Sequence, residues 1–350
     1  MAHLTGNFTT EAPLSAGVRE AISAAFEHGW ADPKKLSQAS HLAQGIRAAA
    51  IEEFASVLEV SPADIEILGE PSLIHHLSLG GFLQPEARLF HSTVDVGRIR
   101  AVARAHQGEV TAMPVGSLGA IEVPKDSDQE SVISLQARNG ETGIDQKLES
   151  WRALAGKKIL DATRAIPYSH QTTGMAAASF DAISWNGPAG ISALVIHDAP
   201  AFRYPVAHIA PIRVPGSYSL PLLVGAVTAL REYRTYEANI NVLRNSLSEK
   251  LSSITGITLV GEKSQSSRYL SIAISVISAE EVLRTLIQSG ISCDAGSACS
   301  PEDLAPSHVI AAMGYATPGH MRFTIHPTTT QHDVDALVVE LDKVLKNLRC

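Results

Sequence analysis

Apolar residues along the first half of the chain recur with two different spacings. Segments 16–28 and 40–58 carry apolar side chains every three or four positions, which is typical of amphipathic helices. Short apolar runs follow, separated in part by helix-length segments such as 96–106 and 146–154. This alternation predicts an α/β fold with a mainly parallel sheet. The runs predicted as strands are 65–68, 87–91, 109–113, 132–136, 158–161 and 193–197.

The pattern changes after Pro215-Gly216. Residues 219–252 carry an apolar stripe that predicts one long helix or a bent pair. The remainder mixes predicted strands and helices, which indicates a smaller α+β domain. We therefore expect a large domain over residues 15–245 and a small domain formed by residues 1–14 and 246–350. The strands predicted there are 257–260, 270–276 and 321–325, and the helices are 279–289, 304–313 and 332–348.

Composition and charge exclude several classes of protein function. The 350 residues are 45% hydrophobic and 18% charged, as in ordinary globular proteins. A net charge of -8 without a basic stripe argues against nucleic-acid binding. The N-terminal segment has no basic region followed by an apolar run, and the apolar runs are too short for membrane spans. With three cysteines in no disulfide pattern, a reducing cytoplasm is the expected compartment.

The most specific motif surrounds Cys299. Segment 295–310 reads AGSACSPEDLAPSHVI. It resembles the cysteine loop of the cysteine desulfurases, GSACTSxxLxPSxVL, with equal spacing from the cysteine to the Pro-Ser pair. Those proteins are pyridoxal phosphate (PLP) enzymes of the class V aminotransferase family, and the loop cysteine takes up the substrate sulfur as a persulfide. The resemblance implies this role for Cys299, provided that its surroundings lower the thiol pKa from about 8.5.

A second motif lies near the C-terminus. Segment 319–335, GHMRFTIHPTTTQHDVD, resembles the family ending RFSxGRxTTxxDID. Arg322 takes the place of the arginine that binds the substrate carboxylate, a task suited to a planar bidentate donor. The resemblance thus implies a small cysteine-like ligand.

Further segments resemble the cofactor site of the family. The turn 139–143, NGETG, places Asn139 beside the cofactor ring. The strand end LDATR places Asp161 at the pyridine nitrogen and Arg164 where the family has a glutamine near the phenolic oxygen. Ser217 stands for a threonine that reaches the partner subunit's cofactor phosphate. The resemblance implies a type I PLP-transferase fold, with a seven-stranded sheet and a homodimer.

The lysine that holds PLP in this family is missing. Segment 184–195, SWNGPAGISALV, resembles the family's SGHKxxGPKGxGAL. Aligned on Gly187-Pro188, the His-Lys pair falls on Ile183 and Ser184, and no lysine occurs between Lys158 and Lys250. A PLP enzyme needs that amine to bind the cofactor as a Schiff base and to move protons.

The segment that corresponds to the family's phosphate-binding turn also differs from the family pattern. It reads LGEPSLIHH over residues 68–76, where only Ser72 keeps a hydroxyl and Glu70 adds a negative charge. The ring-stacking histidine of the family falls on Val96. Without the cofactor, Asp161 would be a strand-end carboxylate paired with Arg164.

Other histidines and cysteines carry weaker signals. His75 and His76 are adjacent, so on a helix they point in different directions, which favours surface or packing roles over metal binding. Cys293 is expected on a strand and Cys350 in the tail. We predict no metal site. Three histidines near the cysteine motif are either proton donors for a leaving group or residues without chemistry: His308, His320 and His326.

These features predict a cysteine desulfurase-like protein that cannot run the standard PLP cycle. PLP would be bound non-covalently or be absent, and Cys299 would accept sulfur, with a sulfur-acceptor protein as a further partner. The first alternative is an active PLP-dependent desulfurase or transaminase with an atypical site. The second is a non-catalytic structural or regulatory paralogue.

Overall fold

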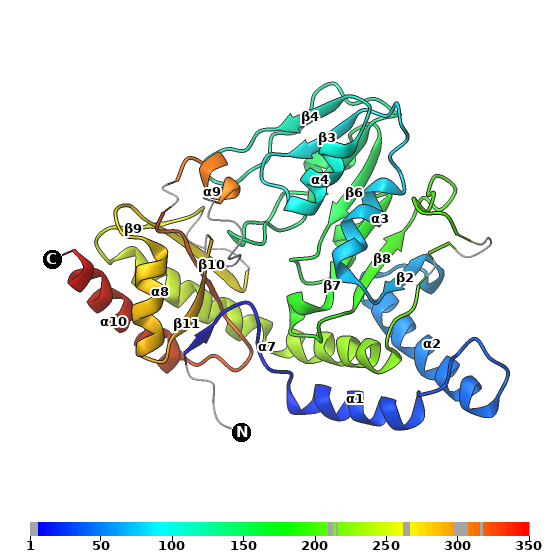
Figure 1. Ribbon diagram of the computed structural model, residues 1–350, viewed down its shortest axis with the longest axis horizontal. Helices are drawn as coiled ribbons and strands as arrows, with labels where there is room; N and C mark the ends of the chain where they lie inside the picture. The colour runs from blue at the N-terminus through cyan, green and yellow to red at the C-terminus, as the bar shows by residue number, and fades with distance from the viewer. Residues whose placement is uncertain are drawn as a thin grey trace.

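The computed structural model describes residues 6–208, 213–214, 216–261, 267–296, 307–315 and 318–349. Two sheets organise these residues (Figure 1). The larger has seven strands in the order β2-β8-β7-β6-β5-β3-β4, and the smaller has five in the order β1-β11-β12-β10-β9. The prediction of a mixed α/β fold with a large and a small sheet is confirmed.

The large sheet is parallel from β4 to β7, whereas β8 runs antiparallel to both of its neighbours. Strands β5, β7 and β8 are buried throughout, because helices cover both faces of the sheet there and make continuous apolar runs favourable, whereas β4 at the edge is partly exposed. One strand was not predicted, since the run AASFD of β7 is rich in alanine, which has low strand propensity. The strands are β2 (Ile65–Leu68), β3 (Leu89–Ser92), β4 (Val110–Met113), β5 (Val132–Gln136), β6 (Lys157–Asp161), β7 (Ala177–Asp181) and β8 (Ser192–Ile196).

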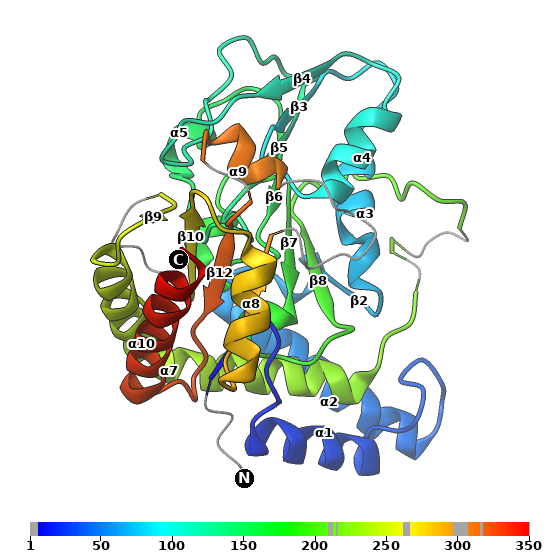
Figure 2. The same ribbon diagram turned by 60° about the vertical axis from the view of Figure 1, so that its left-hand side comes forward.

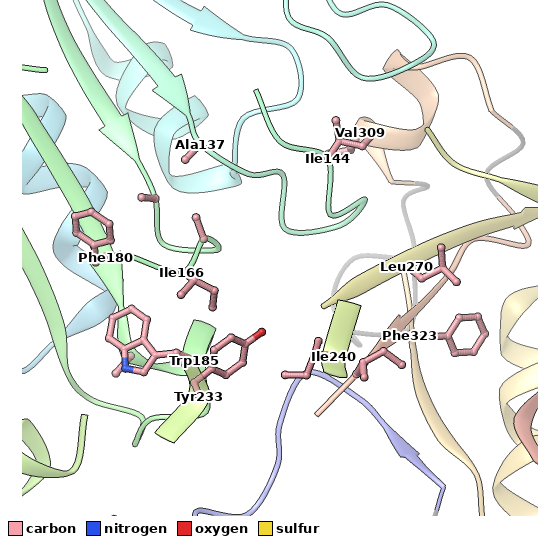
Figure 3. Packing of buried hydrophobic residues seen from close by; sticks show 14 of the residues in the cluster. Ala137, Ile144, Ile166, Phe180, Trp185, Tyr233, Ile240, Leu270, Val309 and Phe323 are labelled. Carbon is pink, nitrogen blue, oxygen red and sulfur yellow. The ribbon is translucent and has the colours of Figure 1, made fainter. Parts of the chain in front are cut away.

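Alternate residues of the strands feed two separate apolar cores. On one face, Leu160 and Phe180 join a core shared with α2 (Gln38–Leu58) and with the small domain. Figure 3 shows Phe180, Ile166, Trp185 and Tyr233 gathered on this face, with Leu270 and Phe323 in the small domain. On the other face, α3 (Ile74–Gly80) and α4 (Gly97–Ala105) cover the sheet through a second core.

The small sheet combines the two ends of the chain. Strand β1 (Asn7–Phe8) pairs in parallel with β11 (Ser292–Ala295), and the remaining pairs are antiparallel. Helices α8 (Ala279–Gln288) and α10 (Gln331–Leu348) lie side by side against this sheet (Figure 2). The other strands are β9 (Ile257–Leu259), β10 (Tyr269–Ile274) and β12 (Met321–Thr324).

Helix α7 (Leu220–Ser252) connects the two parts of the molecule. It packs on α1 (Ala16–His28) and α2 along the large domain and on β9, β10 and α10 in the small one. Ser219 caps its first turn, where Pro221 also favours helix initiation. The helix continues across residue 245, so the division of the chain at that residue remains a prediction.

Several predicted helices are shorter than expected. The helix predicted over 146–154 is reduced to the single turn α5 (Glu149–Arg152), and the described part of 304–313 forms α9 (His308–Ala312). Within the described residues, no helix has the length and apolarity needed to cross a membrane. The remaining short helices are α6 (Ser169–Thr172), η1 (Pro62–Asp64), η2 (Pro71–Leu73) and η3 (Ala182–Trp185).

Candidate active site

Asp161 ends strand β6, and groups of its own chain bind both of its carboxylate oxygens. The Oδ2 atom lies 3.1 Å from His75 Nε2. The Oδ1 atom accepts hydrogen bonds from the backbone N–H of Thr163 (2.9 Å) and from its hydroxyl (2.6 Å). Burial would raise the pKa of Asp161, but His75 and Thr163 outweigh it and lower the pKa to about 2. The expected pair with Arg164 is wrong, because His75 takes that place.

Helix α3 positions His75. It packs against β6, β7 and β8, with Ile74 and Leu77 in the core. His75 is 4% exposed on the covered face, whereas His76 is exposed to solvent. The prediction of a packing role therefore fits His75, but no sequence pattern indicated its contact with Asp161, 86 positions away.

The turn at the start of α3 is closed by its own carboxylate. Glu70 Oε1 accepts a hydrogen bond of 3.0 Å from the backbone N–H of Ser72. Hydrogen bonds from Ser72 also lower the pKa of Glu70. Ser217 lies next to this turn in the same chain, since a Cβ added at Gly69 would be 2.5 Å from its carbonyl oxygen. The structure thus brings Ser217 close to the turn that contains Glu70 and Ser72.

Ser184, which the motif alignment places opposite the family lysine, is fully buried. It belongs to η3, directly after β7. Its hydroxyl donates to the carbonyl oxygen of Thr163, and its own carbonyl accepts a 3.0 Å hydrogen bond from Arg268 Nη1. Ser184 is therefore hydrogen-bonded both to the loop that follows Asp161 and to Arg268, the residue before strand β10.

The side chain of Asn139 is hydrogen-bonded within the turn that it starts and to the neighbouring Val94 and Gln136. Its Nδ2 donates to Val94 O (3.1 Å) and Gln136 Oε1 (3.0 Å). Its Oδ1 accepts from the backbone N–H groups of Glu141 (2.9 Å) and Thr142 (3.0 Å). The side chain is 6% exposed. These contacts stabilise the turn at the C-terminal end of β5.

Arg322 and Arg164 lie on either side of Gly140. Arg322 forms an ion pair of 2.6 Å with Asp294 and donates a hydrogen bond of 2.6 Å to Gly140 O. Arg164 runs over Gly140, since a Cβ added there would meet its Cγ at 2.8 Å. The predicted cofactor and substrate arginines therefore converge on one turn. Cys299 and Cys350 lie outside the described residues.

The three histidines near the cysteine motif differ in environment. His320 and His326 are buried, and burial followed by nearby arginines lowers their pKa values to about 4 and about 3. Both imidazoles are neutral near pH 7, so neither is a protonated general acid at that pH. His308 donates through Nε2 to the carbonyl oxygen of Asp95 at 3.0 Å. Within the described ranges, no group of three histidine, cysteine or acidic side chains is arranged to hold a metal ion.

Solved structures share this architecture. A NifS-like protein superposes with a TM-score of 0.85 at 20% identity, over 97% of this chain and 98% of the other. The cysteine desulfurase CsdA of Escherichia coli gives 0.77 at 18% identity, over 97% and 94%. The fold is that of the type I PLP-dependent transferases.

Sequence comparison narrows the class further. The family model described as aminotransferase class-V matches residues 213–337. A cysteine desulfurase of Klebsiella pneumoniae is 25% identical over 99% of this chain and 93% of its own length. Over residues 213–337 the chain thus matches the class V aminotransferase model, and over almost its whole length it resembles cysteine desulfurases.

Proposed function

We propose that this chain is a desulfurase-like protein that does not hold PLP through a Schiff base, and that Cys299 instead accepts sulfur from another persulfide. The observation that carries the proposal is the state of Asp161. In a PLP site this carboxylate binds the pyridine nitrogen, whereas here His75 and Thr163 bind both of its oxygens. A pyridine nitrogen would have to displace a buried imidazole.

Two further contacts support this proposal. Glu70 binds the N–H of Ser72, at the turn that would otherwise face a phosphate, and its charge repels one. Ser184 has no amine and is hydrogen-bonded within the protein. The residues present do not fit PLP at its ring nitrogen, its phosphate turn or its lysine. General acid–base steps by such an amine contribute about 10²–10⁴-fold, which this chain would lack.

Sulfur transfer to Cys299 needs no cofactor. The thiolate attacks the outer sulfur of a donor persulfide, R–S–SH, and the donor's S–S bond breaks. The donor leaves as the thiol R–SH, and Cys299 becomes Cys–S–SH, without net oxidation. A persulfidated protein or small thiol of the reducing cytoplasm is the proposed donor, and a second thiol protein is the acceptor.

A homodimer is part of this proposal. Phe26, Trp30 and Leu36 are exposed around a groove of about 1140 Å³ that also includes Ser217. Large apolar side chains gathered in one groove indicate a protein interface. A second copy of the chain is the proposed occupant, and the mass of the protein in solution tests it.

We expect a small-molecule persulfide to add one sulfur atom to the peptide that contains Cys299, as measured by mass spectrometry after alkylation. The Cys299→Ser variant should lose this addition. Cys293→Ser is the matched control and should keep it, because Cys293 is buried and burial raises its thiol pKa. Sulfide release from free cysteine by the protein with PLP would contradict the proposal and favour an active desulfurase.

A further inference from the structure

The geometry points to an anion-binding site formed by Arg164, Arg268 and Tyr269 beside Ser184. We propose that it takes a compact oxyanion with two negative charges. The inference rests on the proposed function in one respect only, namely that PLP does not occupy this region.

Arg268 is a buried cation with neutral partners. It is 1% exposed, and it donates to Ser184 O and to His326 Nδ1, both at 3.0 Å. His326 uses Nε2–H to donate to Thr9 O at 2.8 Å, which leaves Nδ1 as an acceptor and the ring neutral. Among the described residues, no carboxylate lies within ion-pair distance of Arg268, although burying a charge without a counter-charge is costly.

Arg164 is the second cation without a carboxylate partner. It is half-buried over Gly140, and in the part of the chain that the structure describes it forms no hydrogen bond or ion pair. Ser184 links it to Arg268, since the serine hydroxyl bonds Thr163 O, one residue before Arg164, while the serine carbonyl binds Arg268. The Arg268 guanidinium therefore binds position 184 directly, and the charges of Arg268 and Arg164 both act on Tyr269.

Tyr269 lies between these charges. The guanidinium carbons of Arg268 and Arg322 are 5.6 Å and 5.8 Å from its ring centre. Its hydroxyl is buried and, within the described residues, has no hydrogen-bond partner. Burial would raise the pKa of this phenol, but the surrounding arginines, Arg268 and Arg164 foremost, lower it, which reports a positive potential at the hydroxyl.

The charge balance sets the ligand class. Two other arginines near Tyr269 already have carboxylates, because Arg138 pairs with Asp145 and Arg322 with Asp294. Among the described residues, Arg164 and Arg268 form no ion pair with a carboxylate, although the Arg164 charge also acts on the buried Asp181 carboxylate. Guanidinium groups bind carboxylate, sulfate or phosphate oxygens through paired N–H donors, and the Tyr269 hydroxyl adds one further donor.

Saturable binding of succinate and of sulfate, measured by calorimetry and by thermal unfolding without PLP, tests the inference. Sodium chloride and acetate at equal ionic strength are the controls and should give no saturable effect. Arg164→Met should abolish binding, whereas Arg104→Met, an exposed arginine of α4, should leave it unchanged. Binding of succinate alone would restrict the site to dicarboxylates, and binding of both would indicate selection by charge and size.

The Tyr269→Phe variant distinguishes an effect on anion binding from an effect on the stability of the fold. Because the hydroxyl has no partner among the described residues, its removal should not lower the unfolding temperature, yet it should weaken anion binding about tenfold. Equal binding by Arg164→Met and the wild type, or no saturable binding at all, would overturn the inference. A Schiff base with added PLP would instead overturn the proposed function, so the two failures are distinguishable.

Discussion

Replacing His75 with leucine is expected to lower the free energy of unfolding by about 3 kcal/mol at pH 7, as measured by urea denaturation. The substitution leaves the Asp161 carboxylate buried without its imidazole partner, and leaving a buried charge without its partner costs about 3–5 kcal/mol. His76→Leu is the matched control. It changes the neighbouring, exposed histidine and should alter stability by less than about 0.5 kcal/mol.

The pH dependence of the same variant has a predicted sign. In the wild type, the pKa of Asp161 is lowered from 3.8 to about 2, so its stabilisation of about 2 kcal/mol is present above pH 4 and is lost as the pH falls from about 4 to 2. In His75→Leu, burial without a partner raises this pKa, and the deficit grows as the pH rises above 4. A variant as stable as His76→Leu at pH 7 would contradict the assignment of the pair.

Restoring the family lysine with Ser184→Lys is expected to destabilise the protein by about 3 kcal/mol or more. Residue 184 is fully buried, and its carbonyl already binds the Arg268 guanidinium, so a second cation would be buried next to the first. We also expect no Schiff-base absorbance with PLP, because His75 still holds Asp161.

The control for this variant places the same residue nearby on the surface. Ala189→Lys adds a lysine at an exposed position five residues later and should leave stability within about 0.5 kcal/mol of the wild type. Stable folding of Ser184→Lys with cofactor bound through the new amine would show that one substitution separates this chain from an active PLP site.

Local patterns were enough to predict most of the sheet. Strand β2 and strand β5 have the predicted bounds, because short apolar runs between turn residues define buried strands. The continuous apolar stripe over residues 219–252 predicted one long helix or a bent pair, and the segment forms the single helix α7. Cys293 lies on a strand, β11, as expected. Strand β1 was not predicted, since its two residues form a strand only through pairing across the whole chain.

The candidate site was predicted in its residues but not in its contacts. Family motifs pointed to Asp161, Arg164 and Arg322, and the structure does bring the last two to the same turn. The partner of Asp161 depends on how α3 crosses β6, which no local pattern encodes. Arg268 was missed for the same reason, because its contacts with Ser184 and His326 join segments that are far apart in the chain.

The absorbance spectrum during titration with PLP, followed by borohydride reduction and peptide mapping, tests the central claim most directly. We predict no Schiff-base band, no reduced lysine adduct, and complete loss of any bound cofactor on dialysis. A visible band together with an adduct at a single lysine would contradict the account and restore PLP-dependent desulfurase chemistry to this protein.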